Sequence, residues 1–140
     1  MDDVDRFLTG WHRTVAERDL DALRALLSED VSLGAPPYWA RIEGRALVHH
    51  LLGLILHTIE DFTYHREWRN GSELALEFMG HVGAVELQGI DLISLGDSAV
   101  IRKLDVLIRP ANGVEALTAV IAPQMMAFVT GRRGDEWRPA

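Results

Sequence analysis

The spacing of apolar residues predicts four helices along the chain. The first apolar residues recur three and four positions apart, as on one buried helical face: Val4, Phe7, Leu8, Trp11 and Val15. A second helix is expected next, with Asp19 or Asp21 as its cap and leucines at positions 20, 23, 26 and 27. A third covers residues 45–59 and is apolar on most of its circumference. The fourth begins at Asn112 or Gly113 and reaches about residue 130, with Pro123 as a kink.

Between the third and fourth helices the pattern changes to that of strands. The segments at residues 62–68, 74–82, 85–95 and 99–109 are strand-like, and glycine-containing turns at Gly71, Gly83 and Gly96 separate them. Four consecutive strands with short links make an antiparallel meander, and a shorter strand is expected at residues 31–33. Helices gathered on one side of a curved sheet make an α+β fold.

The last two strands of this meander are apolar on both faces. In the segment 85–95, Val85, Leu87, Ile93 and Leu95 share one face, whereas Ile90 and Leu92 lie on the other. An antiparallel strand with one solvated face would instead alternate apolar and polar residues. One face therefore packs on the helices, and we expect a second copy of the chain to cover the outer face in a homodimer.

The chain length and the net charge limit the possible domain organisation and the possible binding partners. A chain of 140 residues forms one domain, expected over residues 1–130, followed by a polar tail at 131–140. The net charge of −7 counts against nucleic acids and membrane surfaces as partners. The acidic start is no secretion signal, and the apolar runs at 47–59 and 114–129 are interpreted as buried helices. The expected location is the cytoplasm.

Several kinds of chemistry find no support in the sequence. The absence of cysteine excludes disulfides, thiolate metal sites and a cysteine nucleophile. The adjacent His49 and His50 point apart on a helix, and His57 lies two turns beyond His50, too far to share one ion. No nucleophile elbow, phosphate loop or dinucleotide motif is present. We expect neither a metal nor a cofactor.

Three groups of residues together resemble a known family. They are ERDLDAL at 17–23 with LSEDV at 27–31, IEGR at 42–45, and LQGIDL at 87–92 with VLIRP at 106–110. As a set they resemble the nuclear transport factor 2-like superfamily, and within it the SnoaL-like, polyketide cyclase-like group, over about residues 3–130. The resemblance implies a cone with helices on one side, the sheet on the other and a pocket between them. The superfamily hosts isomerases, hydrolases, cyclases and plain binders, so it does not specify a reaction.

The ketosteroid isomerases of this superfamily use a tyrosine on the first helix, a carboxylate base after the first strand and a protonated aspartic acid on a sheet strand. Alignment on the quoted motifs places Trp11, Ala35 and Gln88 at these positions. Since Ala35 cannot take up a proton, the resemblance does not support the steroid isomerase mechanism.

The epoxide hydrolase-like members use five aligned residues, of which only the final aspartate, Asp105, is kept. The polyketide cyclases need less, because one acid/base side chain in an apolar cone is sufficient. The resemblance therefore makes Asp105 the candidate acid/base, on the concave face with a raised pKa, and Gln88 its hydrogen-bonding neighbour. The alternative for Asp105 is an ion pair with a nearby basic residue or exposure to solvent. By alternation, Asp91 is expected on the outer surface of the sheet.

The expected pocket walls are apolar and aromatic: Trp11, Leu33, Tyr38, Trp39 and Phe78. The same residues would also serve as plain core, or as a lid where two aromatics follow Pro36 and Pro37. Two main functions stay open, and an epoxide hydrolase-like activity is a further alternative. One is an enzyme that isomerises or cyclises a small, largely apolar molecule through Asp105; the other is a non-catalytic binding or dimerisation module with the same cone.

Overall fold

The computed structural model describes residues 2–131, and the polar tail expected at 131–140 lies outside this range beyond Gly131. Its four helices are α1 (Asp3–Glu17), α2 (Leu20–Ala25), α3 (Arg45–Thr58) and α4 (Ala111–Gly131). The strands are β1 (Leu27–Gly34), β2 (Ile42–Glu43), β3 (Glu60–Asn70), β4 (Glu73–Val82), β5 (Val85–Leu95) and β6 (Ile101–Arg109). A short 3-10 turn, η1 (Asp97–Ala99), joins β5 to β6.

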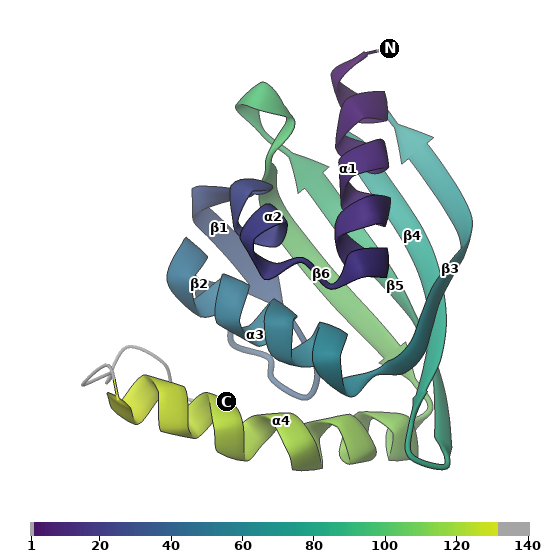
Figure 1. The fold of residues 1–140 in the computed structure, drawn as a ribbon, viewed down its shortest axis with the longest axis vertical. Coiled ribbons are helices and arrows are strands. Elements are labelled where there is room, and N and C mark those ends of the chain that lie inside the picture. The colour runs from purple at the N-terminus through teal and green to yellow at the C-terminus, as the bar shows by residue number, and fades with distance from the viewer. Residues whose placement is uncertain (1, 132–140) are drawn as a thin grey trace.

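The six strands form one sheet in the order β2-β1-β6-β5-β4-β3. The predicted meander of β3 to β6 is antiparallel throughout, while β1 runs parallel to β6 at the other side. Figure 1 shows the sheet curving around α1, α2 and α3, which lie on one face, with α4 crossing the end of the sheet below α3. The predicted α+β architecture with a curved sheet is confirmed.

The structure differs from the sequence-based expectation around β1. The strand expected at 31–33 extends over Leu27–Gly34, and the two-residue β2 pairs with it through Ser32–Glu43 and Leu33–Ile42. The added length comes from the parallel pairing with β6, which no local pattern reveals. Pro36 and Pro37 follow in a loop, as expected, and Pro123 lies inside α4, which continues to Gly131.

Local signals set the ends of several elements. The Asp2 carboxylate accepts a 2.8 Å hydrogen bond from the Asp5 backbone and begins α1. At the other end of α1, Arg18 adopts a left-handed conformation, and its guanidinium donates to the Leu56 carbonyl of α3. Gly71 and Gly83 have φ values of +62° and +59°, as the turns between β3, β4 and β5 require.

The two faces of the sheet have different surroundings. Along β5, the odd-numbered residues from 87 to 95 are buried against the helices, whereas Gln88, Ile90 and Leu92 point to the outer face. The outer face carries four large apolar side chains that are 42–55% exposed: Trp68, Met79, Leu92 and Leu107. The inner face and the helices together enclose the hydrophobic core, and this enclosed space is the cone.

The last helix, α4, is long and apolar enough to cross a membrane by length and composition alone. In the fold it contributes Leu117, Ile121, Met125 and Val129 to the core, spaced four residues apart on one face. We therefore describe α4 as a helix of the domain that covers the end of the cone.

Candidate functional site

A chain of three polar side chains crosses the interior of the cone. The indole nitrogen of Trp11 donates to the Tyr64 hydroxyl at 2.9 Å, and that hydroxyl donates to Oδ2 of Asp91 at 2.5 Å. The three residues come from α1, β3 and β5. The other residues that line the cavity beside this chain are apolar or aromatic.

The local structure accounts for each of these positions. Trp11 lies on the buried face of α1 and stacks on Phe7, with ring centroids 5.8 Å apart. Asp91 has the inward orientation of the odd-numbered residues of β5, opposite Leu76 and Val106 on the neighbouring strands. Tyr64 reaches the same space from β3, at the edge of the sheet. Segments distant in the sequence thus meet at one carboxyl group.

Burial strongly affects the protonation of this group. Removal from water raises the pKa of Asp91 to about 7, although the hydrogen bond from Tyr64 acts in the opposite direction. Burial and the neighbouring Asp91 raise the pKa of Tyr64 well above its ordinary value. Asp91 therefore changes charge near neutral pH, while Tyr64 keeps its proton and remains a hydrogen-bond donor.

A small cavity of about 20 Å³ lies beside this chain. Its aromatic lining includes Phe62 and Phe78, stacked with centroids 4.6 Å apart. Aliphatic residues from α2, α3 and β6 complete it: Leu23, Leu52, Ile55, Leu56, Leu104 and Val106. Since a single water molecule needs about 10–15 Å³ of such space, the cone is almost filled by its own side chains.

The position of the Phe78 ring depends on a glycine on the next strand. Gly89 pairs with Phe78, and a Cβ atom built at position 89 would lie 2.3 Å from the Phe78 ring. The absence of a side chain at Gly89 lets this ring lie flat across β5. The ring then occupies space beside the Tyr64–Asp91 pair.

Asp105 does not lie in the cone, so the predicted placement on the concave face is wrong. It pairs with the exposed Leu92 on the outer side of the sheet, and Oδ1 accepts a 2.5 Å hydrogen bond from the Arg41 guanidinium. Arg41 also donates to the hydroxyl of Ser32. The alternative of an ion pair is the one observed, although its partner comes from the loop before β2 rather than from a nearby basic residue. A catalytic role for Asp105 stays a prediction that activity measurements can test.

Gln88 also points to the outer face, away from Asp91. It belongs to a network across four strands, in which Arg66 contacts Glu77 bidentately, Gln88 donates to Glu77 at 2.7 Å, and Arg109 donates to Gln88 at 2.9 Å. The Arg66 guanidinium lowers the pKa of Glu77 to about 2. The network therefore holds a charged glutamate on the outer face.

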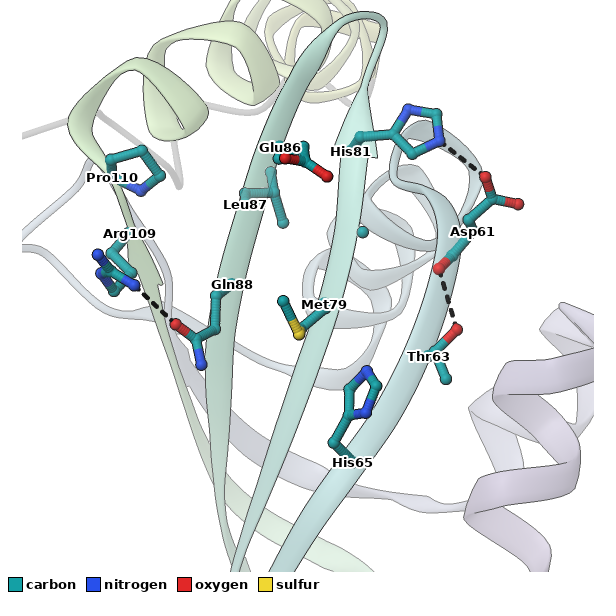
Figure 2. A pocket seen from close by; sticks show the side chains of 11 residues that line it. Asp61, Thr63, His65, Met79, His81, Glu86, Leu87, Gln88, Arg109 and Pro110 are labelled. Carbon is teal, nitrogen blue, oxygen red and sulfur yellow. Dashed lines mark hydrogen bonds and ion pairs between the residues drawn. The ribbon is translucent and has the colours of Figure 1, made fainter.

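An open trough of about 540 Å³ lies next to this network (Figure 2). Figure 2 shows Gln88 and Arg109 on one side, and His81 bonded to Asp61 on the other. His81 contacts Asp61 through Nε2 and the Gly83 carbonyl through Nδ1, both at 2.8 Å. These contacts raise the pKa of His81, because both acceptors favour its protonated form. His81 therefore secures the β4–β5 turn.

Asp91, which was expected on the outer surface, lies inside the cone and is only 6% exposed. Alternation correctly separates Asp91 from Gln88, but the assignment of the two faces was reversed. Both faces of β5 are apolar, so a period of two cannot tell which of them meets the helices. The resemblance to the isomerases places a protonated aspartic acid on a sheet strand at Gln88. Among the described residues, the carboxyl buried inside the cone is that of Asp91, whereas the buried Glu77 is paired with Arg66 on the outer face.

The predicted pocket walls divide into three groups. Trp11 and Phe78 line the cone cavity, and Tyr38 lines a second cleft near the loop that follows β1. Leu33 is fully buried in the core, and Trp39 is 92% exposed and lines neither cavity. Tyr64 was missed, although a tyrosine at alternating spacing from Phe62 in an expected strand is a usable signal. Among residues 2–131, no group of three His, Asp or Glu side chains could hold a metal ion.

Comparison with known proteins places this geometry in a family. No family model and no curated protein sequence matches the chain. The crystal structure of a steroid delta-isomerase from Pseudomonas aeruginosa is 32% identical, covers 93% of this chain and 96% of its own, and has a TM-score of 0.86. An uncharacterized protein with a cystatin-like fold from Silicibacter pomeroyi is also 32% identical, covering 91% of this chain and 92% of its own, with a TM-score of 0.85.

Solved structures of lower sequence identity that are described as NTF2-like proteins share the fold. An NTF2-like protein of unknown function from Cytophaga hutchinsonii is 14% identical, covers 78% of this chain and 92% of its own, and has a TM-score of 0.63. The finer placement in the SnoaL-like group stays a prediction. The cone, the sheet order and the 32% identity to a steroid delta-isomerase over nearly the whole chain show that this chain belongs to the nuclear transport factor 2-like superfamily.

Proposed function

We propose that the protein binds a small, largely apolar molecule with one carbonyl oxygen, held by Asp91 in the cone, where the cavity of about 20 Å³ widens as its lining side chains move apart. The observation that carries this proposal is the buried Tyr64–Asp91 pair at 2.5 Å within an otherwise apolar lining. A site of this kind gains affinity from apolar burial and orients its ligand with few polar groups.

The protonation of Asp91 defines what the ligand must offer. Below its pKa of about 7 the carboxyl is neutral, and Oδ2 accepts from Tyr64. The proton then resides on the other oxygen, which can donate a hydrogen bond to a carbonyl group. Above this pKa the charged carboxylate repels a carbonyl oxygen. We therefore expect ligand affinity to fall as the pH rises above about 7.

Binding is favoured over isomerase chemistry because the described residues that line the cavity offer no base besides Asp91. The lining contains Asp91 and Tyr64 as its ionisable groups, and the position of the isomerase base is Ala35. A donor that polarises a carbonyl still needs a base to remove the neighbouring proton.

An isomerase is the second candidate, and the pKa of Asp91 near neutral pH favours it. A charged Asp91 can take a proton from one carbon of the ligand and return it to another, with no net change in the enzyme. The similar protein from Pseudomonas aeruginosa carries the name of a steroid delta-isomerase. A cyclase would need the same single acid/base group.

The binding test uses Trp11 as an internal reporter. Replacing Trp39, Trp68 and Trp137 by Phe leaves Trp11, inside the cone, as the single tryptophan. Titration with cyclohexanone derivatives and steroid ketones should change its fluorescence saturably. Asp91→Leu should weaken binding about tenfold or more, because leucine cannot donate a hydrogen bond to the ligand carbonyl, whereas Asp105→Asn should not weaken it. Asp91→Asn keeps a donor at this position and should instead remove the pH dependence of the affinity. Equal affinity of the Asp91→Leu variant would reject the proposal.

An assay of turnover separates the two candidates. Incubation with a β,γ-unsaturated ketone, followed by absorbance of the conjugated product, reports proton transfer between carbons. Saturable binding without product supports a binding protein, whereas product formation that Asp91→Asn abolishes supports an isomerase. Product formation that only Asp105→Asn abolishes would restore Asp105 as the catalytic residue.

A further inference from the structure

Trp11 sets the direction of the hydrogen bonds inside the cone. An indole nitrogen carries a proton and has no lone pair to offer, so Trp11 can donate but cannot accept. It donates to the Tyr64 hydroxyl at 2.9 Å, and this hydroxyl lies 2.5 Å from Oδ2 of Asp91. Among the residues that the structure describes, Asp91 is therefore the acceptor for the single proton of Tyr64. The bonds run one way, from α1 to β5.

A tyrosine at position 11 would not have this effect. The isomerases that the sequence resembles have a tyrosine on the first helix, and a phenol hydroxyl can both donate and accept. Tyr64 could then turn its proton toward position 11 and accept a hydrogen bond from Asp91. Trp11 excludes this second arrangement, so the exchange of tyrosine for tryptophan changes the chemistry of the carboxyl two hydrogen bonds away.

The direction of the bonds decides which oxygen of Asp91 can meet a ligand. Oδ2 accepts from Tyr64, so the proton of the neutral carboxyl resides on Oδ1. A neutral Asp91 therefore offers a donor, which suits the oxygen of a ketone. An alcohol can also accept this bond, but its own proton then lacks a partner in the apolar lining, which lowers its affinity.

We propose that Trp11 is a positioning residue that acts through Tyr64 and makes the cone select a ketone over the corresponding alcohol. The selectivity rests on the proposed function, whereas the effect of Trp11 on the carboxyl needs no ligand. Hydrogen bonds in a chain polarise one another, so donation by Trp11 makes Tyr64 a stronger donor. A stronger donor favours the charged carboxylate, and loss of the indole N–H therefore raises the pKa of Asp91.

Other titratable groups near this chain of bonds lie on α1 and β3. His12 contacts the edge of the Tyr64 ring, with ring centroids 5.2 Å apart, and its Nε2 lies 3.0 Å from the Glu67 carboxylate. The side chains of α2, α3, β4 and β6 that line the cavity are apolar. Because His12 and Glu67 are kept in every variant below, their effects on Asp91 cancel in the comparison.

The first test removes the indole N–H and keeps the shape of the ring. Benzothienylalanine, introduced at position 11 by codon suppression, has sulfur in place of the N–H. NMR of labelled carboxyl carbons measures the pKa of Asp91, whose signal is identified by its loss in Asp91→Asn. We expect this pKa to rise by about half a unit to one unit, the equivalent of one ordinary hydrogen bond. In a Tyr64→Phe background the same replacement should cause no shift, because the effect passes through Tyr64.

Two further variants separate positioning from packing. Trp11→Phe also removes the donor and should raise the pKa of Asp91 in the same direction. Phe7→Leu changes the ring that stacks on Trp11 at 5.8 Å but keeps the indole N–H, so it should leave this pKa unchanged. An unchanged pKa with the analogue, or an equal shift in the Tyr64→Phe background, would show that Trp11 contributes packing alone.

The second test measures selectivity by calorimetry, with a phenyl-substituted cyclohexanone and the corresponding cyclohexanol. At about pH 6 we expect the protein to prefer the ketone about tenfold, and the analogue at position 11 to reduce this preference at least about threefold. Above the pKa of about 7 the charged carboxylate accepts from the alcohol, so the preference should reverse.

The outcomes separate this inference from the proposed function. Equal affinities for ketone and alcohol, or a preference that the analogue leaves unchanged, would overturn the selectivity assigned to Trp11. If neither compound binds, the selectivity and the proposed function both fail, while the NMR titration still decides whether Trp11 acts on Asp91 through Tyr64.

Discussion

The Tyr64 hydroxyl donates a 2.5 Å hydrogen bond to the Asp91 carboxyl in the interior of an apolar cone. Tyr64 cannot ionise near neutral pH, because burial and Asp91 raise its pKa, whereas Asp91 titrates at about 7. The pair therefore combines a permanent donor with a carboxyl that changes charge in the physiological range. Asp91 is thus the residue of the cavity lining whose charge changes near neutral pH.

The first prediction concerns the pH dependence of stability. Folded Asp91 keeps its proton up to about pH 7, while the unfolded chain releases it near the ordinary value of 3.8. The folded state thus binds more protons between these values, and the free energy of unfolding falls with rising pH by up to about 1.4 kcal/mol per unit. Asp91→Asn should remove this decline. Urea unfolding of both proteins at about pH 5 and about pH 7 measures it.

Asp105→Asn is the control for this prediction, because Asp105 is partly exposed and paired with Arg41 on the outer face. It should keep the decline of the parent protein. An unchanged decline in Asp91→Asn would show that another group is responsible.

The second prediction concerns the glycine beneath Phe78. Gly89→Ala places a methyl group 2.3 Å from the ring and 2.6 Å from the Leu107 carbonyl, so it should lower the free energy of unfolding by about 1–3 kcal/mol. Thermal or urea unfolding provides the measurement. Gly10→Ala, where nothing lies within 4 Å, should instead stabilise helix α1 by up to about 1 kcal/mol.

A double variant tests the cause of this destabilisation. Phe78→Leu removes the ring that the new methyl group meets, so Gly89→Ala should cost less in its presence. Strictly additive losses in the double variant would contradict the proposed contact.

The third prediction assigns a positioning role to Asp105. Its partner Arg41 ends the loop that carries Tyr38 and Trp39, and it also donates to Ser32 on β1. Asp105→Asn should change stability by at most about 1 kcal/mol, as a partly exposed ion pair contributes little. It should nevertheless speed hydrogen exchange of the Tyr38 amide, which donates to the Ala35 carbonyl within the loop.

Glu29→Gln is the matched control for this prediction, since it removes an exposed ion pair with Arg45 that does not touch the loop. Unchanged exchange at Tyr38 in Asp105→Asn would show that the Arg41 contact does not position the loop.

The fourth prediction concerns the outer face of the sheet, where we propose that a second copy of the chain packs. Trp68, Met79, Leu92 and Leu107 together expose an apolar surface of the kind that marks an interface. Leu107→Glu should convert the dimer into a monomer, as measured by size-exclusion chromatography with light scattering. Val120→Glu, on the exposed face of α4, should leave the dimer intact. A monomeric parent protein, or a dimer broken only by Val120→Glu, would contradict this interface.

Local patterns predicted much of the fold. The three-and-four spacing on α1 identified the face that carries Trp11, and glycines at turns separated the strands of the meander. These features depend on neighbours in the sequence, so propensity and periodicity are sufficient to predict them. The length of β1 depends on its parallel pairing with β6, which is distant in the sequence, and local patterns could not indicate it.

The candidate site shows the same division at the level of single residues. By itself, the sequence determined that Asp91 and Gln88 lie on opposite faces of β5, because a strand repeats every two residues. Only the tertiary structure decided that the face of Asp91 meets the helices, since both faces of the strand are apolar and a period of two has no inside or outside. The same packing brought Tyr64 and Trp11 to this carboxyl and placed Asp105 beside Arg41 on the outer face. The chemistry of the cone thus follows from which surface is covered, a property of the folded chain as a whole.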